Sequence, residues 1–230
     1  MTHMALTAFF VFMTVAAYLL SRYLYFRYSN PLINIVLLSA AAIIAVLVLT
    51  NMPYQAYAPA KDIMTFLLGP ATVALAVPLY RNRHLLRQYG TAICLGVGVG
   101  TLVSMATVLV ITRAGGLARE IIVSIIPKSS TIPFAVDVAQ LAGGNSALAV
   151  AFVVATGTFG SVIGLSLLSW CKIHDPVARG LAMGTVSHGQ GTAMALLEGE
   201  QQGSMAGVAM ALAGVFTSVL APVLIAWFVD

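Results

Sequence analysis

The chain has 230 residues, of which 60% are hydrophobic and only 8% are charged, with a mean hydropathy of +0.98. Soluble domains carry about 25% charged residues, so this composition excludes a soluble protein and predicts a helical protein that crosses a membrane several times. The formal net charge of +4 comes from short loops, so it bears on membrane orientation and does not indicate a nucleic-acid partner.

Eight apolar segments are long enough to be membrane helices. The first, residues 6–20, lacks a basic stretch before it and a small-residue cleavage site after it, which favours an uncleaved helix over a signal peptide. The others are expected at residues 31–49, 62–80, 90–112, 117–141, 147–171, 177–200 and 205–229, with a loop at 50–61. We expect Cys94 and Cys171 to be buried free thiols, because both lie in apolar segments without a spacing partner.

The segment 117–141 is interrupted near its middle by two prolines, Pro127 and Pro133. Each proline lacks a backbone N–H and disfavours a helical conformation in the residue before it, so we predict an extended break between two half-helices. In lipid, such a break persists only where protein buries it or where it lines a watery cavity. The break carries a lysine and three hydroxyl residues: Lys128, Ser129, Ser130 and Thr131. This composition favours half of a substrate site in a transporter of small solutes.

Two other segments are interrupted. Gly69 and Pro70 divide the segment 62–80, and a stronger, polar break divides the segment 177–200. That break holds Thr185, Ser187, His188, Gly189, Gln190, Gly191 and Thr192. Between the interrupted segments, Gly143-Gly144-Asn145-Ser146 is expected to end one helix and cap the next, and Asp175-Pro176 is a signature of a helix start.

The order of plain and interrupted segments repeats at an offset of about 120 residues, which aligns Gly69-Pro70-Ala71-Thr72 with Gly189-Gln190-Gly191-Thr192. Transporters are commonly built from such repeats, and their sites lie where interrupted helices of the two halves meet. We therefore predict one membrane domain, 1–230, with repeat halves 1–112 and 113–230.

Basic residues in the loops constrain the topology. If the loops at 22–27, 81–87 and 172–179 are cytoplasmic, one segment between Gly90 and Cys171 must enter the membrane without crossing it. The broken segment 117–141 is the natural candidate. The glycine-rich faces of the plain segments on either side could pack within one chain or between protomers, and we expect a homo-oligomer.

Lys128 is the main candidate for substrate binding. A charge near the bilayer centre costs about 2.5–3.5 kcal/mol and is kept mostly where it is paired or faces a pathway. Lys128 can therefore meet an anion, helped by the three neighbouring hydroxyls and by the N–H groups that open the next half-helix near Phe134. The alternative is that Lys128 extends to a lipid headgroup from a shallow break.

His188 and Asp137 are candidates for proton coupling. His188 titrates near neutral pH and can relay protons or bind substrate, or it can be a neutral histidine bound to a backbone carbonyl. Asp137 can be a counter-ion for Lys128 or a proton carrier, or a charge that reaches interfacial water. Gly189 and Gly191 allow the backbone to approach a ligand closely, and Ser187, Gln190 and Thr192 add neutral hydrogen-bonding groups.

Nothing in the sequence has the pattern of a nucleophile elbow, a phosphate-binding loop or a metal cluster, so we expect no enzymatic activity, no cofactor and no metal. Glu198 and Glu200 flank Gly199 beside two glutamines. This arrangement favours a solvated loop over a catalytic pair of carboxylates.

Three motifs, in order, carry a resemblance to a known family, and the resemblance covers nearly the whole chain. They are Pro70-Ala71-x-Val73-Ala74-Leu75-Ala76-x-Pro78-Leu79-Tyr80, Pro127-Lys128-Ser129-Ser130-Thr131-x-Pro133, and Arg179-Gly180-Leu181-Ala182-Met183-Gly184-Thr185-x-Ser187-His188-x-x-Gly191-Thr192. The chain resembles the LrgB/CidB family of bacterial antiholin-like inner-membrane proteins, which is related to the chloroplast glycolate/glycerate translocator. Gly189-Gln190 departs from the small apolar residue expected after the histidine.

The resemblance implies a multi-pass protein of the bacterial inner membrane and two competing functions. One is transport of small monocarboxylates such as pyruvate, glycolate or glycerate, usually with a small LrgA-type partner. The other is control of murein hydrolase release and cell lysis. The residues favour transport, because a pore-former has no evident need for two polar breaks that hold a lysine and a histidine. A scaffold that only anchors a partner would keep the two breaks apart, each sealed by protein.

Overall fold

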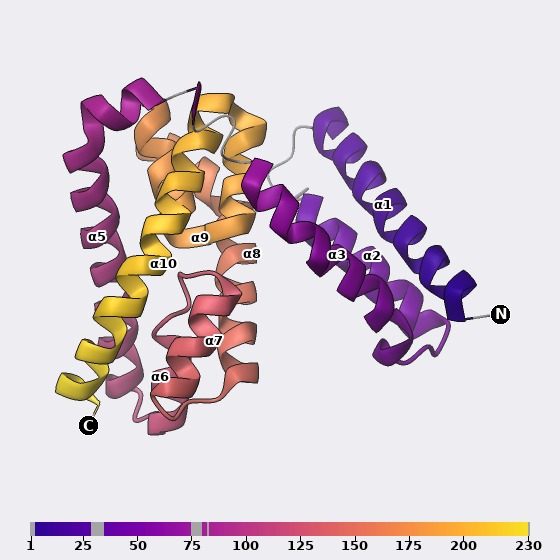
Figure 1. Ribbon diagram of the computed structural model, residues 1–230, viewed down its shortest axis with the longest axis horizontal. Coiled ribbons are helices and arrows are strands. Elements are labelled where there is room, and N and C mark those ends of the chain that lie inside the picture. The colour runs from indigo at the N-terminus through magenta and orange to yellow at the C-terminus, as the bar shows by residue number, and fades with distance from the viewer. Residues whose placement is uncertain (1–2, 29–34, 75–79, 82, 230) are drawn as a thin grey trace. The chain divides into compact units, whose positions relative to one another are not determined.

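The computed structural model describes residues 3–28, 35–74, 80–81 and 83–229, and its regular elements in this part of the chain are all α-helices. The helices, labelled in Figure 1, are α1 (His3–Tyr28), α2 (Ile35–Leu49), α3 (Tyr54–Ala74), α5 (Arg83–Ala114), α6 (Arg119–Ile125), α7 (Ile132–Leu141), α8 (Ser146–Trp170), α9 (Pro176–Glu198) and α10 (Glu200–Phe228). The predicted all-α class is confirmed for the described residues. The chain forms two compact units, unit 1 (Met1–Val77) and unit 2 (Pro78–Asp230).

The predicted caps start two of these helices. Asn145 precedes α8, and its side-chain oxygen accepts hydrogen bonds from the backbone N–H groups of Ala147 and Leu148 at 3.0 and 3.2 Å. Asp175 precedes α9 and accepts from the Ala178 N–H at 2.8 Å. A side-chain acceptor at this position satisfies N–H groups that the first helical turn leaves free.

Helices α1 and α3 extend further than the sequence predicts. α1 continues to Tyr28 through basic and tyrosine residues expected as a loop, and α3 begins at Tyr54, inside the predicted loop 50–61. Arginine and tyrosine can lay their apolar parts along a helix while their polar ends reach water. A membrane helix therefore need not end where the purely apolar residues end.

The break predicted at Gly69 and Pro70 is not observed, because α3 continues through both residues to Ala74. A proline inside a helix removes one backbone hydrogen bond, which membrane helices tolerate through local adjustment and neighbouring contacts. The rest of the predicted segment, 75–79, lies outside the described residues. The predicted repeat halves do not coincide with the two compact units, because α5 packs with α9 and α10; the repeat stays a prediction.

In unit 1, α1 packs against both α2 and α3 around a small apolar core. Phe10 of α1 is fully buried, and its ring makes an edge contact with the Tyr57 ring at a centroid distance of 5.6 Å. The Tyr57 hydroxyl lies 3.1 Å from Thr14 Oγ1. The contact between α1 and α3 thus combines aromatic packing with one hydrogen bond.

Three long helices, α5, α8 and α10, run through unit 2, and α6, α7 and α9 pack against them. Two apolar clusters hold these helices together, one between α5, α6, α7 and α10 and one between α5, α9 and α10. Because lipid is as apolar as these side chains, such contacts stabilise a membrane protein through close packing rather than through exclusion of water.

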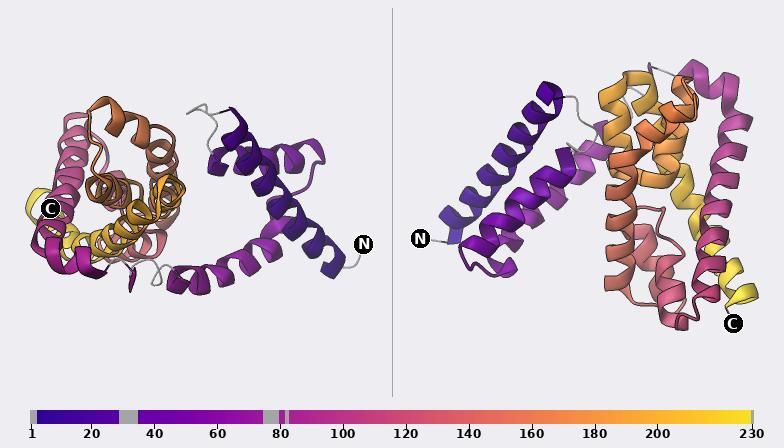
Figure 2. Two further views of the ribbon diagram at one scale, coloured as in Figure 1. Left: turned by 90° about the horizontal axis from the view of Figure 1, so that it is seen from above. Right: turned by 180° about the vertical axis from the view of Figure 1, so that it is seen from behind.

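Helices α6 and α7 form a hairpin with its tip at residues 126–131. The start of α6 lies beside the end of α7, because Arg119 Nη1 donates to the Ala142 carbonyl at 3.0 Å. Asn145 Nδ2 donates to Glu120 Oε1 at 3.2 Å, which ties the same base to the start of α8. Figures 1 and 2 show this hairpin at the end of unit 2 where α5 ends and α8 begins.

Helix α9 is also folded back on itself. A straight helix would separate Arg179 from Glu198, 19 residues apart, by about 28 Å, yet their side chains form an ion pair with Nη2 and Oε1 2.5 Å apart. The reversal occurs at His188, whose backbone dihedrals of φ 39° and ψ −125° are not helical. α9 is therefore a second hairpin with its tip at His188, and Figure 1 shows it at the opposite end of unit 2 from α6 and α7.

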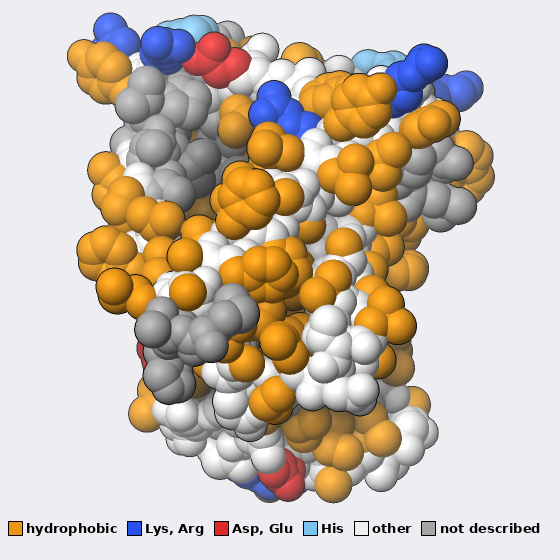
Figure 3. Space-filling model, turned by 90° about the vertical axis from the view of Figure 1, so that its right-hand side faces the viewer, with side chains coloured by type: hydrophobic (Ala, Val, Ile, Leu, Met, Phe, Trp, Pro, Cys, Tyr) orange, Lys and Arg blue, Asp and Glu red, His pale blue; other side chains and the backbone are white. Residues whose placement is uncertain are grey.

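Four described helices are long and apolar enough to cross a membrane: Met4–Tyr28, Arg87–Ala114, Ser146–Trp170 and Glu200–Phe228. Hydrophobic side chains dominate the face shown in Figure 3, as expected for a surface in contact with lipid. Cys94 and Cys171 are free thiols, but both are exposed; the prediction that they are buried is wrong. Cys94 lies on the surface of α5 and Cys171 follows the last residue of α8, and apolar neighbours in the sequence cannot distinguish such positions from a buried core.

Candidate functional site

The tip of the α6–α7 hairpin presents Lys128 to two serine hydroxyls. Lys128 Nζ donates to Ser104 Oγ on α5 at 3.1 Å and to Ser129 Oγ at 3.2 Å, and the two hydroxyl oxygens lie 2.8 Å apart. Lys128 is half-buried and Ser129 is buried. In the described part of the chain, no ion pair joins Lys128 to a carboxylate. The ammonium charge is therefore held by neutral groups only.

Pro127 and Pro133 lie at the two ends of this tip, where their missing N–H groups interrupt no helical hydrogen bond. Pro127 follows the end of α6, and the tip is closed by turn hydrogen bonds from the Lys128 N–H to the Ile125 carbonyl and from the Ser130 N–H to the Pro127 carbonyl, both at 3.0 Å. Pro133 occupies the first turn of α7, where a missing N–H costs nothing. Thr131 precedes α7 in an extended conformation, and its side chain caps no backbone N–H.

The other predicted residues of the first tip have distinct surroundings. Ser130 is 1% exposed, and its hydroxyl has no hydrogen-bond partner within the described residues. Thr131 is half-buried. Asp137 is exposed on the outer side of α7, whereas Ala135 and Val138 of the same helix are buried. The hypothesis that Asp137 is the counter-ion of Lys128 is therefore wrong in this conformation.

The tip of α9 is anchored to α8 by His188. Its Nε2 lies 3.1 Å from the Val153 carbonyl oxygen, and a carbonyl only accepts, so Nε2 carries the proton and Nδ1 is the free acceptor of the neutral ring. Thr192 Oγ1 donates to the His188 carbonyl at 2.8 Å. A non-glycine residue at this positive φ costs of order 1–3 kcal/mol and persists only where its surroundings fix it.

Three glycines on one side of α8 receive the α9 tip. A methyl group at Gly157, Gly160 or Gly164 would overlap His188, Ser187 or Met183, respectively. Small residues let membrane helices approach closely, so these glycines fix where the α9 tip lies. The glycine face of the segment 147–171 thus packs within the chain.

The two glycines of the second break differ in role. A methyl group at Gly191 would overlap the Met183 carbonyl across the hairpin, whereas one at Gly189 would meet no atom within 4 Å. Gly191 is therefore required for the close approach of the two arms of α9. Gln190 lies against Gly157, and its Oε1 is buried without a hydrogen-bond partner in the described structure.

Both tips line one cavity. Its volume is about 660 Å³, and Lys128 of the first tip and Ser187 of the second both line it, together with α8 residues such as Phe159 and Gly160. The Lys128 ammonium is also near enough to His188 for a Coulombic interaction between the two. The structure thus brings Lys128, Ser187 and His188 together, whereas Asp137 is exposed on α7.

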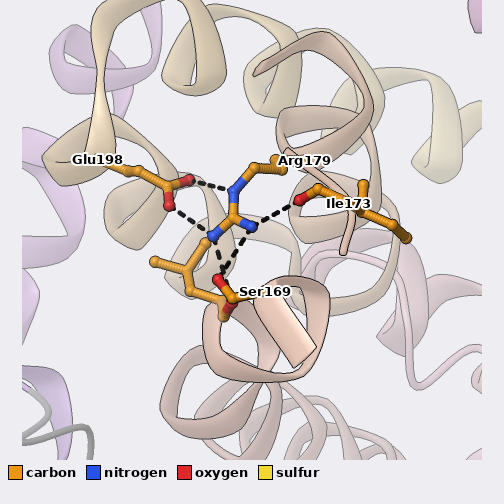
Figure 4. A network of polar contacts seen from close by, with 5 residues as sticks. Ser169, Ile173, Arg179 and Glu198 are labelled. Carbon is orange, nitrogen blue, oxygen red and sulfur yellow. Dashed lines mark hydrogen bonds and ion pairs between the residues drawn. The ribbon is translucent and has the colours of Figure 1, made fainter. Parts of the chain in front are cut away.

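Arg179 and Glu198 form a buried ion pair that sequence reasoning missed (Figure 4). Arg179 is 6% exposed, and its guanidinium donates to both carboxylate oxygens of Glu198, to Ser169 Oγ and to the carbonyls of Leu165 and Ile173. The expectation of a solvated loop omitted this pair, although Glu198, the last residue of α9, is itself exposed. The sequence contains one signal for this pair. The polar break around His188 lies midway between Arg179 and Glu198, and a helix that folds back there brings the two side chains together.

Two residues of α5 were also missed. Ser104 binds the Lys128 ammonium, and Thr101, one turn earlier, is 1% exposed with a hydroxyl that has no partner in the described structure. Hydroxyls in an otherwise apolar helix were the available signal. Within the described residues, no cluster of three His, Cys, Asp or Glu side chains has the arrangement of a metal site.

Comparison with known proteins identifies the family. The model of the LrgB-like family matches residues 14–227. The chain is 37% identical over 217 residues to the uncharacterized protein YxaC of Bacillus subtilis, with 94% of each chain covered. It is 34% identical over 217 residues to the uncharacterized protein YwbG of the same organism, with 94% of this chain and 96% of that protein covered.

A third relative carries a functional name. The chain is 34% identical over 218 residues to the holin-like protein CidB of Staphylococcus epidermidis, with 95% of each chain covered. No solved structure matches the chain. The long apolar helices and these relatives together make it a multi-pass membrane protein. The chain therefore belongs to the LrgB-like family.

Proposed function

We propose that the chain is a membrane carrier of small monocarboxylates such as pyruvate, glycolate or glycerate. The anion binds between the two hairpin tips, residues 127–133 and 185–192. The observation that carries the proposal is Lys128, a half-buried ammonium that contacts only hydroxyls and lines the same cavity as Ser187. A charge in such a position is retained where it meets a ligand or a pathway.

A single free charge at the site favours monocarboxylates over dicarboxylates. The buried Arg179 is committed to Glu198, so it leaves Lys128 as the cation of the site among the described residues. A second carboxylate would lie in a mostly apolar cavity, where an unpaired charge is costly. A small substrate with one carboxylate matches the single cation and places no second charge in the apolar cavity.

Neutral groups complete the binding site. Ser129, Ser130 and Thr131 supply hydroxyls, and the N–H of Phe134, in the first turn of α7, has no partner within its own helix. Ser187 and Gln190 approach from the second tip, and Thr192 supports that tip through its bond to the His188 carbonyl. Pro127, Pro133 and Gly191 hold the backbone of the two tips in place.

Proton coupling belongs to the same proposal. His188 has a free Nδ1 in its neutral form, so it can accept a proton without losing its bond to Val153. Asp137, exposed on α7, can exchange protons on the outer side of the hairpin. Uptake of one proton with each anion would keep the translocated complex neutral.

The arrangement of unit 2 supports alternating access in the bacterial inner membrane. The two hairpins enter from opposite ends, so neither crosses, while α5, α8 and α10 span. The start of α5 lies beside the start of α10, where Arg81 Nη1 is 3.6 Å from Glu200 Oε1. We assign this basic end to the cytoplasm, and we expect a homo-oligomer and a small LrgA-type partner.

A second function is supported by the name of the staphylococcal relatives, "holin-like protein". A regulator of murein hydrolase release and lysis would need no defined anion site. It would permeabilise membranes without chemical preference, and its effect would not depend on Lys128 or His188.

Uptake of labelled pyruvate or glycolate into liposomes, with and without the partner, tests the proposal. We expect saturable uptake that Lys128→Ala lowers at least tenfold and that succinate inhibits poorly, because a lost charged hydrogen bond is worth about 1.5–3 kcal/mol. Lys172→Ala, in the loop after α8, is the control. Non-saturable entry together with release of an uncharged dye, unaffected by Lys128→Ala, would instead favour the holin-like function.

A further inference from the structure

Two hydroxyls of α5 near the two tips are bonded differently from those of Thr107 and Thr112 on the same helix. Serine and threonine in a membrane helix usually bond the carbonyl four residues earlier. On α5 itself, Thr107 does so to Val103 and Thr112 does so to Val108, both at 2.7 Å. Ser104 instead bonds Ser129 and Lys128 across the unit.

Thr101 is the second exception on α5. Its hydroxyl is buried without a partner, and the same holds for Ser130 Oγ on the first tip and Gln190 Oε1 on the second. These are the buried side-chain oxygens without partners in the described part of the chain, and all three lie on elements that meet at the tips. Buried polar groups are nearly always hydrogen-bonded, so each exception calls for a ligand, an ion or a water molecule.

Helix α5 contacts both tips within about one turn. A methyl group at Gly100 would lie 3.2 Å from Thr185 Cγ2 on α9, and Ser104 reaches the first tip. Thr101 lies between these two contacts. Residues three apart on a helix are neighbours, with Cβ atoms about 5–6 Å apart, so Thr101 is the neighbour of Ser104 on α5.

We infer that Thr101 and Ser104 of α5 form a third wall of the anion site and donate hydrogen bonds to the bound carboxylate. The inference rests on the proposed function and adds these two residues to it. In the unliganded state, Ser104 holds the Lys128 ammonium in place. When a carboxylate arrives, Lys128 and the Ser104 hydroxyl turn to one of its oxygens, and Thr101 and Ser130 donate to the other.

The chemistry at this wall selects a planar, monoanionic oxyacid group. Two hydroxyls and one ammonium supply donors on one side of the ligand, as a carboxylate requires. Metal cations need several oxygen ligands and usually a carboxylate, and the neighbouring lysine would repel them. The α5 hydroxyls therefore determine the affinity for the carboxylate group, whereas the cavity, which Lys128 lines together with residues of α8 and α9, contacts the rest of the substrate.

Isosteric removal of the hydroxyls tests the inference in liposomes that hold the full chain. Thr101→Val and Ser104→Ala should each raise the KM for labelled pyruvate about 10- to 100-fold, as expected for a hydrogen bond to a charged group. Thr112→Val, at a buried threonine of the same helix whose hydroxyl bonds its own backbone, is the matched control. It should leave KM within about twofold.

A second measurement separates binding from folding. Thr101→Val should melt no lower than wild type, because it removes a buried group that has no partner, yet pyruvate should stabilise the variant less than wild type. If wild type shows saturable uptake while both variants match Thr112→Val, the α5 wall is refuted and the carrier function stands. If wild type shows neither uptake nor stabilisation by pyruvate, acetate or glycolate, both proposals are refuted.

Discussion

Replacing Arg179 by methionine should open the base of the α9 hairpin. Arg179 is the group that joins the two arms, because it lies on the first arm and binds Glu198 on the second through two hydrogen bonds. It also satisfies Ser169 Oγ and two carbonyls at the end of α8 (Figure 4). Methionine keeps much of the volume but removes every one of these donors, and of the acceptors only the Leu165 carbonyl keeps another side-chain donor, the Ser169 hydroxyl at 2.9 Å.

The structure sets the size of the effect. Removal of one partner of a buried ion pair costs about 3–5 kcal/mol, because the remaining charge is left unpaired. The Glu198 side chain is 26% exposed, so water recovers part of that loss. We therefore expect a decrease in the free energy of unfolding of about 3 kcal/mol, at the lower end of the range.

The exposed pair between Arg81 and Glu200 is the control. Its side chains are 68% and 52% exposed, and such pairs contribute about 0–1 kcal/mol. The free energy of unfolding of each variant is measured by SDS titration of the purified chain in mixed micelles. The unfolding is followed by the fluorescence of Trp170 and Trp227. The reasoning is refuted if Arg179→Met destabilises no more than Arg81→Ala, or if the additional change Glu198→Met restores no stability, since apolar replacement of both partners is often nearly neutral.

Two further substitutions test the geometry of the α9 tip. Gly160→Ala should destabilise by about 1–3 kcal/mol, because its methyl group would overlap the Ser187 hydroxyl, whereas Gly96→Ala, which meets no atom within 4 Å, should be neutral or stabilising in the same assay. At His188, glycine should be more stable than alanine by about 1–3 kcal/mol, because only glycine adopts this positive φ without strain. The opposite order, with alanine better by about 1 kcal/mol, would mean that residue 188 is helical after all.

The sequence predicts an extended stretch between Pro127 and Pro133, whereas the structure has hydrogen-bonded turns there. α6 ends at Ile125 and α7 begins at Ile132, but Ile126, the residue before Pro127, keeps helical dihedrals of φ −49° and ψ −48°, so the expected effect of proline on the preceding residue is not observed. The same local rule failed at Pro70, where α3 continues. One proline removes one backbone hydrogen bond, and a helix can continue without it. Two prolines with polar residues between them remove more of the stabilising interactions, and the helix ends.

The composition of residues 185–192 predicted the position of the second tip, but it could not predict that the helix reverses its direction there. Seven polar and glycine residues in the segment 185–192 predicted a break, and the helix reverses at His188 alone. That reversal is stabilised by distant contacts, namely the α8 glycines, the Val153 carbonyl and the Arg179–Glu198 pair. Sequence periodicity carries no information on such contacts. For the same reason, the sequence shows Ser104 and Thr101 only as hydroxyls in an apolar helix, and their closeness to the tips follows from the fold.

The two hairpins differ in what holds their tips, and this difference bears on how a carrier of this design would move. The α9 tip interlocks with α8 through Gly157 and Gly160 and through the bond to Val153, so it cannot shift without breaking packed contacts. The α6–α7 tip is bound to α5 through hydrogen bonds among Lys128, Ser129 and Ser104. A carboxylate can replace those bonds one for one. The first tip can therefore exchange its bonds to α5 for bonds to the substrate at little cost while the second tip stays fixed to α8, so we expect the first tip to open and close the site.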